Sequence, residues 1–219
     1  MIRIKNLFLK YVRQYFALYD INLEISVGET VAFVGPAESG RTSLLRILAK
    51  LEKPTKGEAY IKNIPLKKLN FAEDISLGYV PASPIFFENK TVYENLLYVA
   101  KLYSRRPAQT ESAINQVLKD FEIEKFKEVL VADLSVYEKY IVSLARLALR
   151  KIDILLVDEV LDCLNENQKE SVIKILLQKF LTPETIFILS TKDQSIAQLL
   201  CKRIVYFENG SIVDERMNA

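Results

Sequence analysis

The sequence predicts an α/β fold with a mostly parallel central sheet, and two observations carry that prediction. Three short runs, at 30–34, 152–159 and 185–191, are almost continuously aliphatic, β-branched or aromatic, which is typical of strands buried on both faces. Segments with apolar residues at helical spacing separate these runs, as at 42–51 and 170–180. Strands that alternate with helices along a chain indicate parallel pairing.

The remaining strands are expected in an antiparallel β subdomain and in a closing hairpin. Residues 21–27 alternate between apolar and polar, which predicts a half-buried strand. The segment 58–66 has the pattern of a hairpin, and 75–81 ends a short strand at a proline turn. A hairpin around Asn209-Gly210 closes the chain at 203–214, because Asn-Gly suits a tight turn between strands.

The middle of the chain is mostly helical and interrupts this alternation. Capping boxes predict helices that begin at Thr91 and Ser135, and a further helix is expected to begin near Thr110. We therefore predict one domain with an inserted helical subdomain: domain 1–219, core about 1–84 and 145–219, and helical subdomain about 85–144.

Composition excludes several classes of function. The net charge is only +2, from 30 basic and 28 acidic residues, so no basic excess indicates nucleic-acid binding. Histidine is absent, which excludes a Ser-His-Asp triad and histidine-ligated zinc. Cys163 and Cys201 are far apart, as expected for reduced thiols in a cytosolic protein. The apolar stretches fall short of the ~18 residues that a membrane span needs, so a membrane link is expected through a partner.

A glycine-rich loop between the first buried strand and a helix is the leading candidate site. Gly35 and Gly40 have the spacing of a phosphate-binding loop, and Thr42 supplies the expected hydroxyl. Glycines let backbone N–H groups point inward to phosphates, and the helix N-terminus adds positive potential. The alternative is an ordinary strand-to-helix turn. The candidate nucleotide-binding residues of the loop are Gly35, Pro36, Ala37, Glu38, Ser39, Gly40, Arg41, Thr42 and Ser43.

Two carboxylates end the second buried strand. Asp158 is placed to hold Mg²⁺ through water, together with Thr42, and Glu159 to orient an attacking water. Acidic residues at strand ends are common, so this pattern alone is weak evidence for a nucleotide site. Together with the glycine-rich loop about 115 residues upstream, it is strong evidence.

With these motifs in order, nearly the whole chain resembles the nucleotide-binding domain of an ABC transporter. The resemblance implies ATP and Mg²⁺ as cofactors, an integral membrane transporter subunit as partner, and a cytoplasmic location at the inner face of the membrane. Tyr11 falls at the adenine-stacking position, although it also suits the packing of an edge strand. The other matching positions are Ala82 at the Q-loop, Leu134, Ser135, Val136, Tyr137 and Glu138 at the signature, 161–165 at the D-loop, and Lys192 at the switch.

Two of these segments suit a purely structural role equally well. Ser135 and Glu138 are fully accounted for as a helix capping box. The apolar stretch 83–87 fits a core segment as well as the groove into which a transporter's coupling helix presses.

The loop itself departs from the family pattern in two places. Arg41 stands where the family has lysine, and its planar fork differs in reach and geometry from an ammonium group. Glu38 stands where glycine is usual. A carboxylate about 5 Å from a phosphate oxygen repels it by about 3 kcal/mol at an effective dielectric constant of about 20. A positive φ there would cost about 1–2 kcal/mol more.

The other motifs depart as well. Ala82 replaces the Q-loop glutamine, Lys192 the switch histidine, and Asn165 the D-loop aspartate. Val136 and Tyr137 replace the signature glycines, where a partner's γ-phosphate approaches backbone N–H groups.

The sequence thus predicts a degenerate ATP-binding subunit with weak nucleotide binding and slow or absent hydrolysis, in which Glu159 and Lys192 are the candidate catalytic residues. Because the signature is obstructed, we expect it to work beside a second nucleotide-binding subunit, as a heterodimer and not a homodimer. The alternative is a non-catalytic scaffold that docks on a membrane partner without nucleotide. A soluble protein acting on DNA or ribosomes is disfavoured, since coiled-coil heptads and a basic excess are absent.

Overall fold

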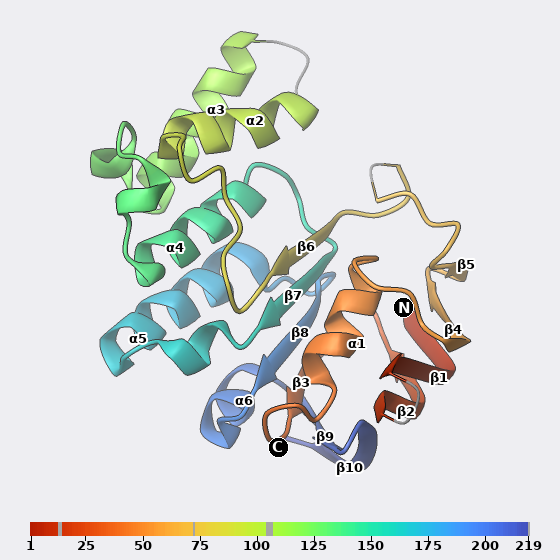
Figure 1. Cartoon of the computed structure of the whole chain (residues 1–219). Coiled ribbons are helices and arrows are strands. Elements are labelled where there is room, and N and C mark those ends of the chain that lie inside the picture. The colour runs from red at the N-terminus through yellow and green to blue at the C-terminus, as the bar shows by residue number, and fades with distance from the viewer. Residues whose placement is uncertain (13–14, 72, 104–106, 219) are drawn as a thin grey trace. The chain divides into compact units, whose positions relative to one another are not determined.

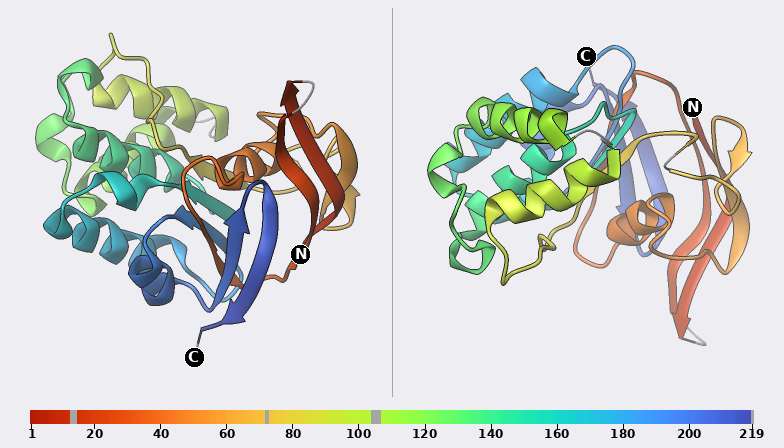
Figure 2. Two further views of the ribbon diagram at one scale, coloured as in Figure 1. Left: turned by 60° about the horizontal axis from the view of Figure 1, so that its bottom comes forward. Right: turned by 90° about the horizontal axis from the view of Figure 1, so that it is seen from above.

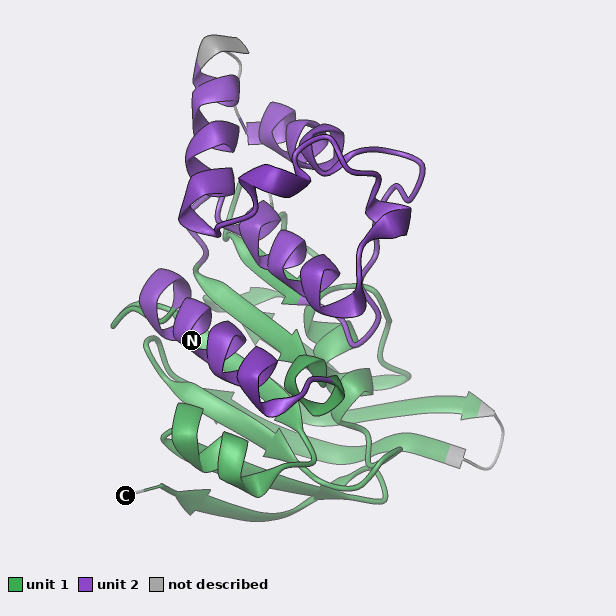
Figure 3. Ribbon diagram, turned by 90° about the vertical axis from the view of Figure 1, so that its left-hand side faces the viewer, with its two compact units in different colours: residues 1–79, 153–163, 181–219 green, residues 80–152, 164–180 purple. Residues whose placement is uncertain are grey.

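The computed structural model describes residues 1–12, 15–71, 73–103 and 107–218, which form two compact units. Unit 1 comprises Met1–Tyr79, Asp153–Cys163 and Leu181–Ala219, and unit 2 comprises Val80–Ile152 and Leu164–Phe180 (Figure 3). Helix α5 therefore groups with unit 2, although it lies beyond the segment expected as the helical insertion.

The described residues of unit 1 form two sheets, two α-helices and a 3₁₀ turn (Figure 1). The antiparallel sheet has the order β2-β1-β4-β5, and the second sheet has the order β10-β9-β3-β8-β7-β6. The strands are β1 (Ile2–Val12), β2 (Tyr15–Ile25), β3 (Thr30–Val34), β4 (Lys56–Ile61), β5 (Ile64–Pro65), β6 (Leu77–Val80), β7 (Ile154–Asp158), β8 (Ile186–Thr191), β9 (Arg203–Glu208) and β10 (Ser211–Met217). The helices are α1 (Arg41–Leu48), α6 (Gln194–Leu200) and a 3₁₀ turn at Val160–Cys163.

Parallel pairing in the second sheet brings the candidate residues to one edge. β8 pairs in parallel with both β3 and β7, so the carboxyl ends of all three strands lie together. Val34 pairs with Thr191, and Asp158 pairs with Ser190. The glycine-rich loop follows β3, while the two carboxylates and the switch segment lie at the carboxyl ends of β7 and β8.

One apolar core joins the two sheets of unit 1 through α1. Leu44, Leu45, Ile47 and Leu48 of α1 are fully buried with side chains from β1, β2, β3, β7 and β8. Helix α6 contacts β3 and β8 (Figure 2). Both faces of β3 are thus covered, which explains its nearly continuous apolar run.

Unit 2 is helical. Its elements are α2 (Val92–Tyr103), α3 (Pro107–Asp120), α4 (Val136–Leu147), α5 (Glu166–Ile175), a π-helical turn at Leu176–Phe180, and 3₁₀ turns at Glu124–Phe126 and Val131–Asp133. The predicted capping boxes are confirmed: Thr91 with Glu94 begins α2, and Ser135 with Glu138 begins α4. Helix α3 begins at Pro107, three residues before the expected start.

The predicted hairpin turn near the end of the chain is also confirmed. Asn209 and Gly210 both have positive φ in the turn between β9 and β10. Cys163 is an exposed free thiol and Cys201 a buried one. Within the described ranges, no helix is long and apolar enough to cross a bilayer.

Candidate functional site

The candidate site in unit 1 is a hollow of about 310 Å³ at the carboxyl edge of the parallel strands. The loop, the start of α1 and Glu159 directly after β7 contribute to it, together with one residue each of β1 and β2. Its lining residues are Tyr11, Ala17, Glu38, Gly40, Arg41, Thr42, Ser43 and Glu159.

Glycine is required at two positions of the loop. A Cβ on Gly35 would lie 2.3 Å from the carbonyl oxygen of Phe207, and Gly40 has a φ of 102° as the residue before α1. Among the described residues, no side chain caps the first turn of α1, so its backbone N–H groups remain donors toward the loop. This backbone has the features that a phosphate group requires.

Glu38 has a left-handed backbone. Its φ of 62° is one that non-glycine residues adopt at a cost of about 1–2 kcal/mol. The condition on which the sequence argument depended, a positive φ at this position, is therefore met. Glu38 also lines the hollow, so it adds an acidic residue to a site that is expected to take an anionic ligand.

Arg41 is the most unusual residue of the site. Its side chain is 3% exposed and folds back into its own loop. Nε donates to Ser39 Oγ at 3.2 Å, and Nη2 donates to the carbonyl of Pro36 at 3.2 Å. Nη2 also donates to Glu159 Oε1 at 2.9 Å, so the arginine and the candidate catalytic carboxylate form a partly buried ion pair.

The candidate metal ligands lie next to each other. Thr42 Oγ1 donates to Asp158 Oδ1 at 2.9 Å, and Asp158 is only 1% exposed. The other oxygen, Oδ2, accepts from the Tyr79 hydroxyl at 3.0 Å. Burial, and then the neighbouring Asp158 carboxylate, raise the pKa of Tyr79 above its ordinary value, so it remains a donor.

These residues fit Mg²⁺ only in combination with phosphate. Among the described residues, no cluster of three histidine, cysteine, aspartate or glutamate side chains is suited to a metal ion. Mg²⁺ is commonly held by one or two protein ligands, substrate phosphates and waters. Thr42 and Asp158 supply such a partial set.

Tyr11 lies at the mouth of the hollow with a side chain that is 53% exposed. Its hydroxyl is within hydrogen-bond distance of Ser43 Oγ, at 3.1 Å, and of Glu52 Oε2, at 2.7 Å. Burial of the hydroxyl raises the pKa of Tyr11. The structure thus brings Tyr11 beside the loop, and stacking of its ring on a base stays a prediction.

Lys192 does not line the hollow. Its exposed backbone segment is tied to the D-loop position: Asp162 accepts hydrogen bonds from the Thr191 hydroxyl and from the Lys192 backbone N–H, the latter at 3.0 Å. Asn165 caps α5 by accepting from the backbone N–H of Gln168 at 3.0 Å.

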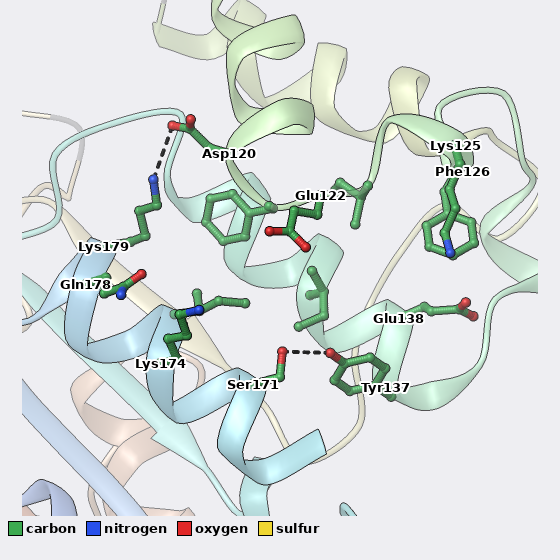
Figure 4. A pocket seen from close by; sticks show the side chains of 14 residues that line it. Asp120, Glu122, Lys125, Phe126, Tyr137, Glu138, Ser171, Lys174, Gln178 and Lys179 are labelled. Carbon is green, nitrogen blue, oxygen red and sulfur yellow. Dashed lines mark hydrogen bonds and ion pairs between the residues drawn. The ribbon is translucent and has the colours of Figure 1, made fainter. Parts of the chain in front are cut away.

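The remaining predicted residues belong to unit 2. The carbonyl oxygen of Ala82 accepts from the Tyr140 hydroxyl. Val136 is 55% exposed in the first turn of α4. Tyr137 donates to Ser171 of α5 at 2.9 Å, in the wall of a hollow of about 330 Å³ within this unit (Figure 4). At the signature positions, Tyr137 and the capping pair therefore have local structural roles.

Two contacts of the acidic residues at the end of β7 were not predicted from the sequence. The pairing of Arg41 with Glu159 joins residues 118 positions apart, and the Tyr79–Asp158 bond joins residues 79 positions apart. The only signal for the first was an unusual arginine in the loop together with an acidic strand end. No sequence signal distinguished Tyr79 from the other ten tyrosines.

Comparison with known proteins identifies the class of protein that this fold and site define. The sequence model of the ABC transporter family matches residues 18–162. An ATP-binding cassette solved as a dimer in a post-hydrolysis state, bound to ADP and Pi, is 26% identical and covers 100% of this chain and 99% of its own, with a TM-score of 0.87. The structure of cbiO1 from Clostridium perfringens, part of the ABC transporter complex cbiONQ, covers 99% of this chain and 88% of its own and is 25% identical, with a TM-score of 0.81.

Curated relatives agree. The probable sulfate/thiosulfate import ATP-binding protein CysA of Chlorella vulgaris is 32% identical over 90% of this chain and 83% of its own length. Mouse ATP-binding cassette sub-family A member 9 is 29% identical over 96% of this chain, which spans only 13% of that much longer protein. The chain belongs to the ABC transporter family and is an ATP-binding cassette of it, a class that binds ATP with Mg²⁺.

Proposed function

We propose that this chain is a degenerate ATP-binding subunit of an ABC transporter, one that binds ATP-Mg weakly and hydrolyses it slowly or not at all. The observation that carries the proposal is the ion pair between Arg41 and Glu159, 2.9 Å long, with the arginine 3% exposed. The same guanidinium that should neutralise phosphate already neutralises the carboxylate that should orient water.

Binding of a triphosphate has to compete with this arrangement. The guanidinium donates to the Pro36 carbonyl and the Ser39 hydroxyl, on the inner side of the loop. A phosphate that recruits Arg41 must break the bond to Glu159 or share it. Glu38 adds a further negative charge at the hollow. Both effects lower the affinity for ATP-Mg. The loop backbone, Thr42 and Asp158 still offer contacts to phosphate and Mg²⁺, so weak binding is expected to remain.

When bound, Mg²⁺ neutralises charge on the β- and γ-phosphates. In this chain Thr42 and Asp158 are the residues that would hold it. Glu159 would have to leave Arg41 before its carboxylate could accept a proton from water. Ala82 and Lys192, at the Q-loop and switch positions, supply neither an amide acceptor nor an imidazole.

We also propose that the chain works beside a second, complementary nucleotide-binding subunit. Tyr137 and the exposed Val136 stand at the signature positions where a partner's nucleotide would approach the start of α4. A heterodimer would let this chain's own hollow face an unobstructed signature. Sedimentation with ATP-Mg should therefore show little self-association, and a tight nucleotide-dependent homodimer would contradict this part.

The proposed membrane partner is an integral transporter subunit, which places the chain at the cytoplasmic face of the membrane. Unit 2 exposes Ile85, Phe87, Tyr98 and Leu102 by 69%, 50%, 55% and 64%. Phe87 and Tyr98 meet edge to face at 5.0 Å and line a hollow of about 390 Å³. Such an exposed apolar group fits a docking helix. Phe87→Asp should reduce co-purification with the membrane subunit, whereas Lys174→Asp should not.

Calorimetric titration with ATP-Mg tests the nucleotide part of the proposal. We expect weak but measurable binding in the wild-type chain and tighter binding in Arg41→Lys, because lysine cannot make the same forked contacts with the loop and Glu159. Arg216→Lys, on an exposed strand, serves as the control. Absence of heat and of thermal stabilisation at millimolar ATP would favour the alternative.

That alternative is a scaffold that keeps the fold and the membrane-docking surface without nucleotide. It is favoured by Glu38, whose negative charge repels a phosphate, and by Arg41, whose guanidinium is already paired with Glu159. In that case the wild-type chain would still co-purify with its membrane subunit in the absence of ATP.

A further inference from the structure

The hydroxyl of Tyr11 is held by two side chains of the segment that follows the loop. Oη lies 2.7 Å from Glu52 Oε2 and 3.1 Å from Ser43 Oγ, while the side chain is 53% exposed. Glu52 lies between α1 and β4, and Ser43 lies in the first turn of α1. A largely exposed ring is therefore fixed at its far end.

The donors in this group can be assigned from chemistry. A carboxylate only accepts, so the single phenolic proton of Tyr11 is donated to Glu52. The Ser43 hydroxyl must then donate to the Tyr11 oxygen. The bond to Glu52 is charge-assisted, and such bonds are stronger than neutral ones.

Glu52 is itself held in place. Its side chain is only 16% exposed, and its Oε2 lies 3.7 Å from Nε of Arg46, one turn further along α1. Tyr11 is in this way connected, through Glu52, to the same helix that presents Thr42. Tyr11, Thr42 and Ser43 line one continuous hollow.

We propose that Glu52 is a positioning residue that fixes the Tyr11 ring for stacking on a purine base and so sets the preference for ATP over a base-free triphosphate. This rests on the proposed function, because it requires that the hollow bind nucleotide. A ring already immobilised loses less rotamer freedom when a base stacks on it. Ser43 contributes to the same anchor, but it also belongs to the loop segment expected to hold phosphate.

The test compares ATP-Mg with Mg-tripolyphosphate, which has the phosphates but no base. Dissociation constants for both are measured on the full chain and on Glu52→Gln, Tyr11→Phe and the double variant. Tyr11→Phe keeps the ring and removes only the hydroxyl. The control pair is Glu58→Gln and Tyr60→Phe, because Tyr60 donates to Glu58 in the same way on β4, outside the hollow.

We expect Glu52→Gln and Tyr11→Phe each to weaken ATP binding about threefold to tenfold, with tripolyphosphate affinity changed less than about twofold. Glu52→Gln removes the charge that strengthens the bond, and Tyr11→Phe removes the bond itself. The double variant should therefore match Tyr11→Phe, since without the hydroxyl the residue at position 52 no longer holds the ring. The control pair should change neither constant.

The experiment distinguishes a failure of this inference from a failure of the proposed nucleotide binding. If tripolyphosphate and ATP bind equally well to the wild type, or if Tyr11→Phe leaves their ratio unchanged, the inference is overturned while nucleotide binding stands. If Glu52→Gln weakens both ligands alike, Glu52 acts through charge and not through the ring, which also overturns it. If neither ligand binds at millimolar concentration, the proposed function falls and the inference with it.

Discussion

Replacement of Glu159 by glutamine removes the negative charge that faces Arg41 and nearly preserves the shape of the side chain. Arg41 is 3% exposed, and its Nη1 has no hydrogen-bond partner among the described residues, so the guanidinium depends on its remaining contacts. In a cassette whose catalytic carboxylate is unpaired, the equivalent change should leave the stability of the free protein nearly unchanged, whereas here it should be destabilising.

The magnitude follows from the exposure of the two partners. Removal of one partner of a fully buried ion pair costs about 3–5 kcal/mol. Glu159 is 34% exposed, so solvent screening reduces this figure, and the bonds from Arg41 to Ser39 and Pro36 persist. We expect Glu159→Gln to lower the free energy of unfolding by about 1–2 kcal/mol. For a chain of this size that is a fall in Tm of about 2–8 °C.

Urea unfolding and calorimetry without nucleotide measure this loss. Glu166→Gln is the matched control, because Glu166 makes a 2.8 Å ion pair with Lys169 while its side chain is 88% exposed, and little or no loss is expected. An equal loss in both variants, or a gain in stability for Glu159→Gln, would refute the claim that a partly buried Arg41–Glu159 pair exists in solution.

Three further predictions concern the loop, a helix cap and the thiols. Glu38→Gly should tighten ATP binding by about tenfold or more, because it removes a negative charge from the hollow; an unchanged calorimetric affinity would show that the electrostatic account of the loop is wrong. The hydrogen bond from Lys90, followed by that from the Thr91 backbone, lowers the pKa of Glu94 below its usual 4.5. The ionised Glu94 side chain therefore stabilises the folded chain above pH 4.5, and this stabilisation is lost as the pH falls through the lower pKa of the folded state. In urea unfolding at a series of pH values, Glu94→Gln should therefore be destabilising near neutral pH, and its difference from the wild type should vanish in acid; a constant difference would contradict this. A thiol reagent should modify exposed Cys163 in the native chain and Cys201 only after unfolding, since burial leaves Cys201 2% exposed and raises its pKa; simultaneous modification would count against the packing of α6.

The fold was predictable because local patterns and pairing rules agree. The buried run of β3, the capping boxes of α2 and α4 and the Asn-Gly turn are each short-range signals, and the structure confirms them. The contact of Thr42 with Asp158 follows from parallel pairing, which places the ends of β3 and β7 at one edge.

The orientation of Arg41 was not predictable in the same way. An arginine in a phosphate loop can point toward the ligand, toward Glu38 or toward Glu159, and the choice depends on distances between segments far apart in the chain. The same holds for Tyr79 and Glu52, whose partners Asp158 and Tyr11 are brought near only by the tertiary fold.

Steady-state ATP hydrolysis by the purified chain, compared with Glu159→Gln, tests the central claim most directly. Loss of one preorganised contact costs about 10²–10³ in rate, and here Arg41 and Glu159 engage each other while the Q-loop and switch residues are altered. We predict turnover near background in the wild type, with Glu159→Gln no slower. Brisk wild-type turnover that is lost in Glu159→Gln would contradict the account, because it would show that Glu159 orients water despite Arg41.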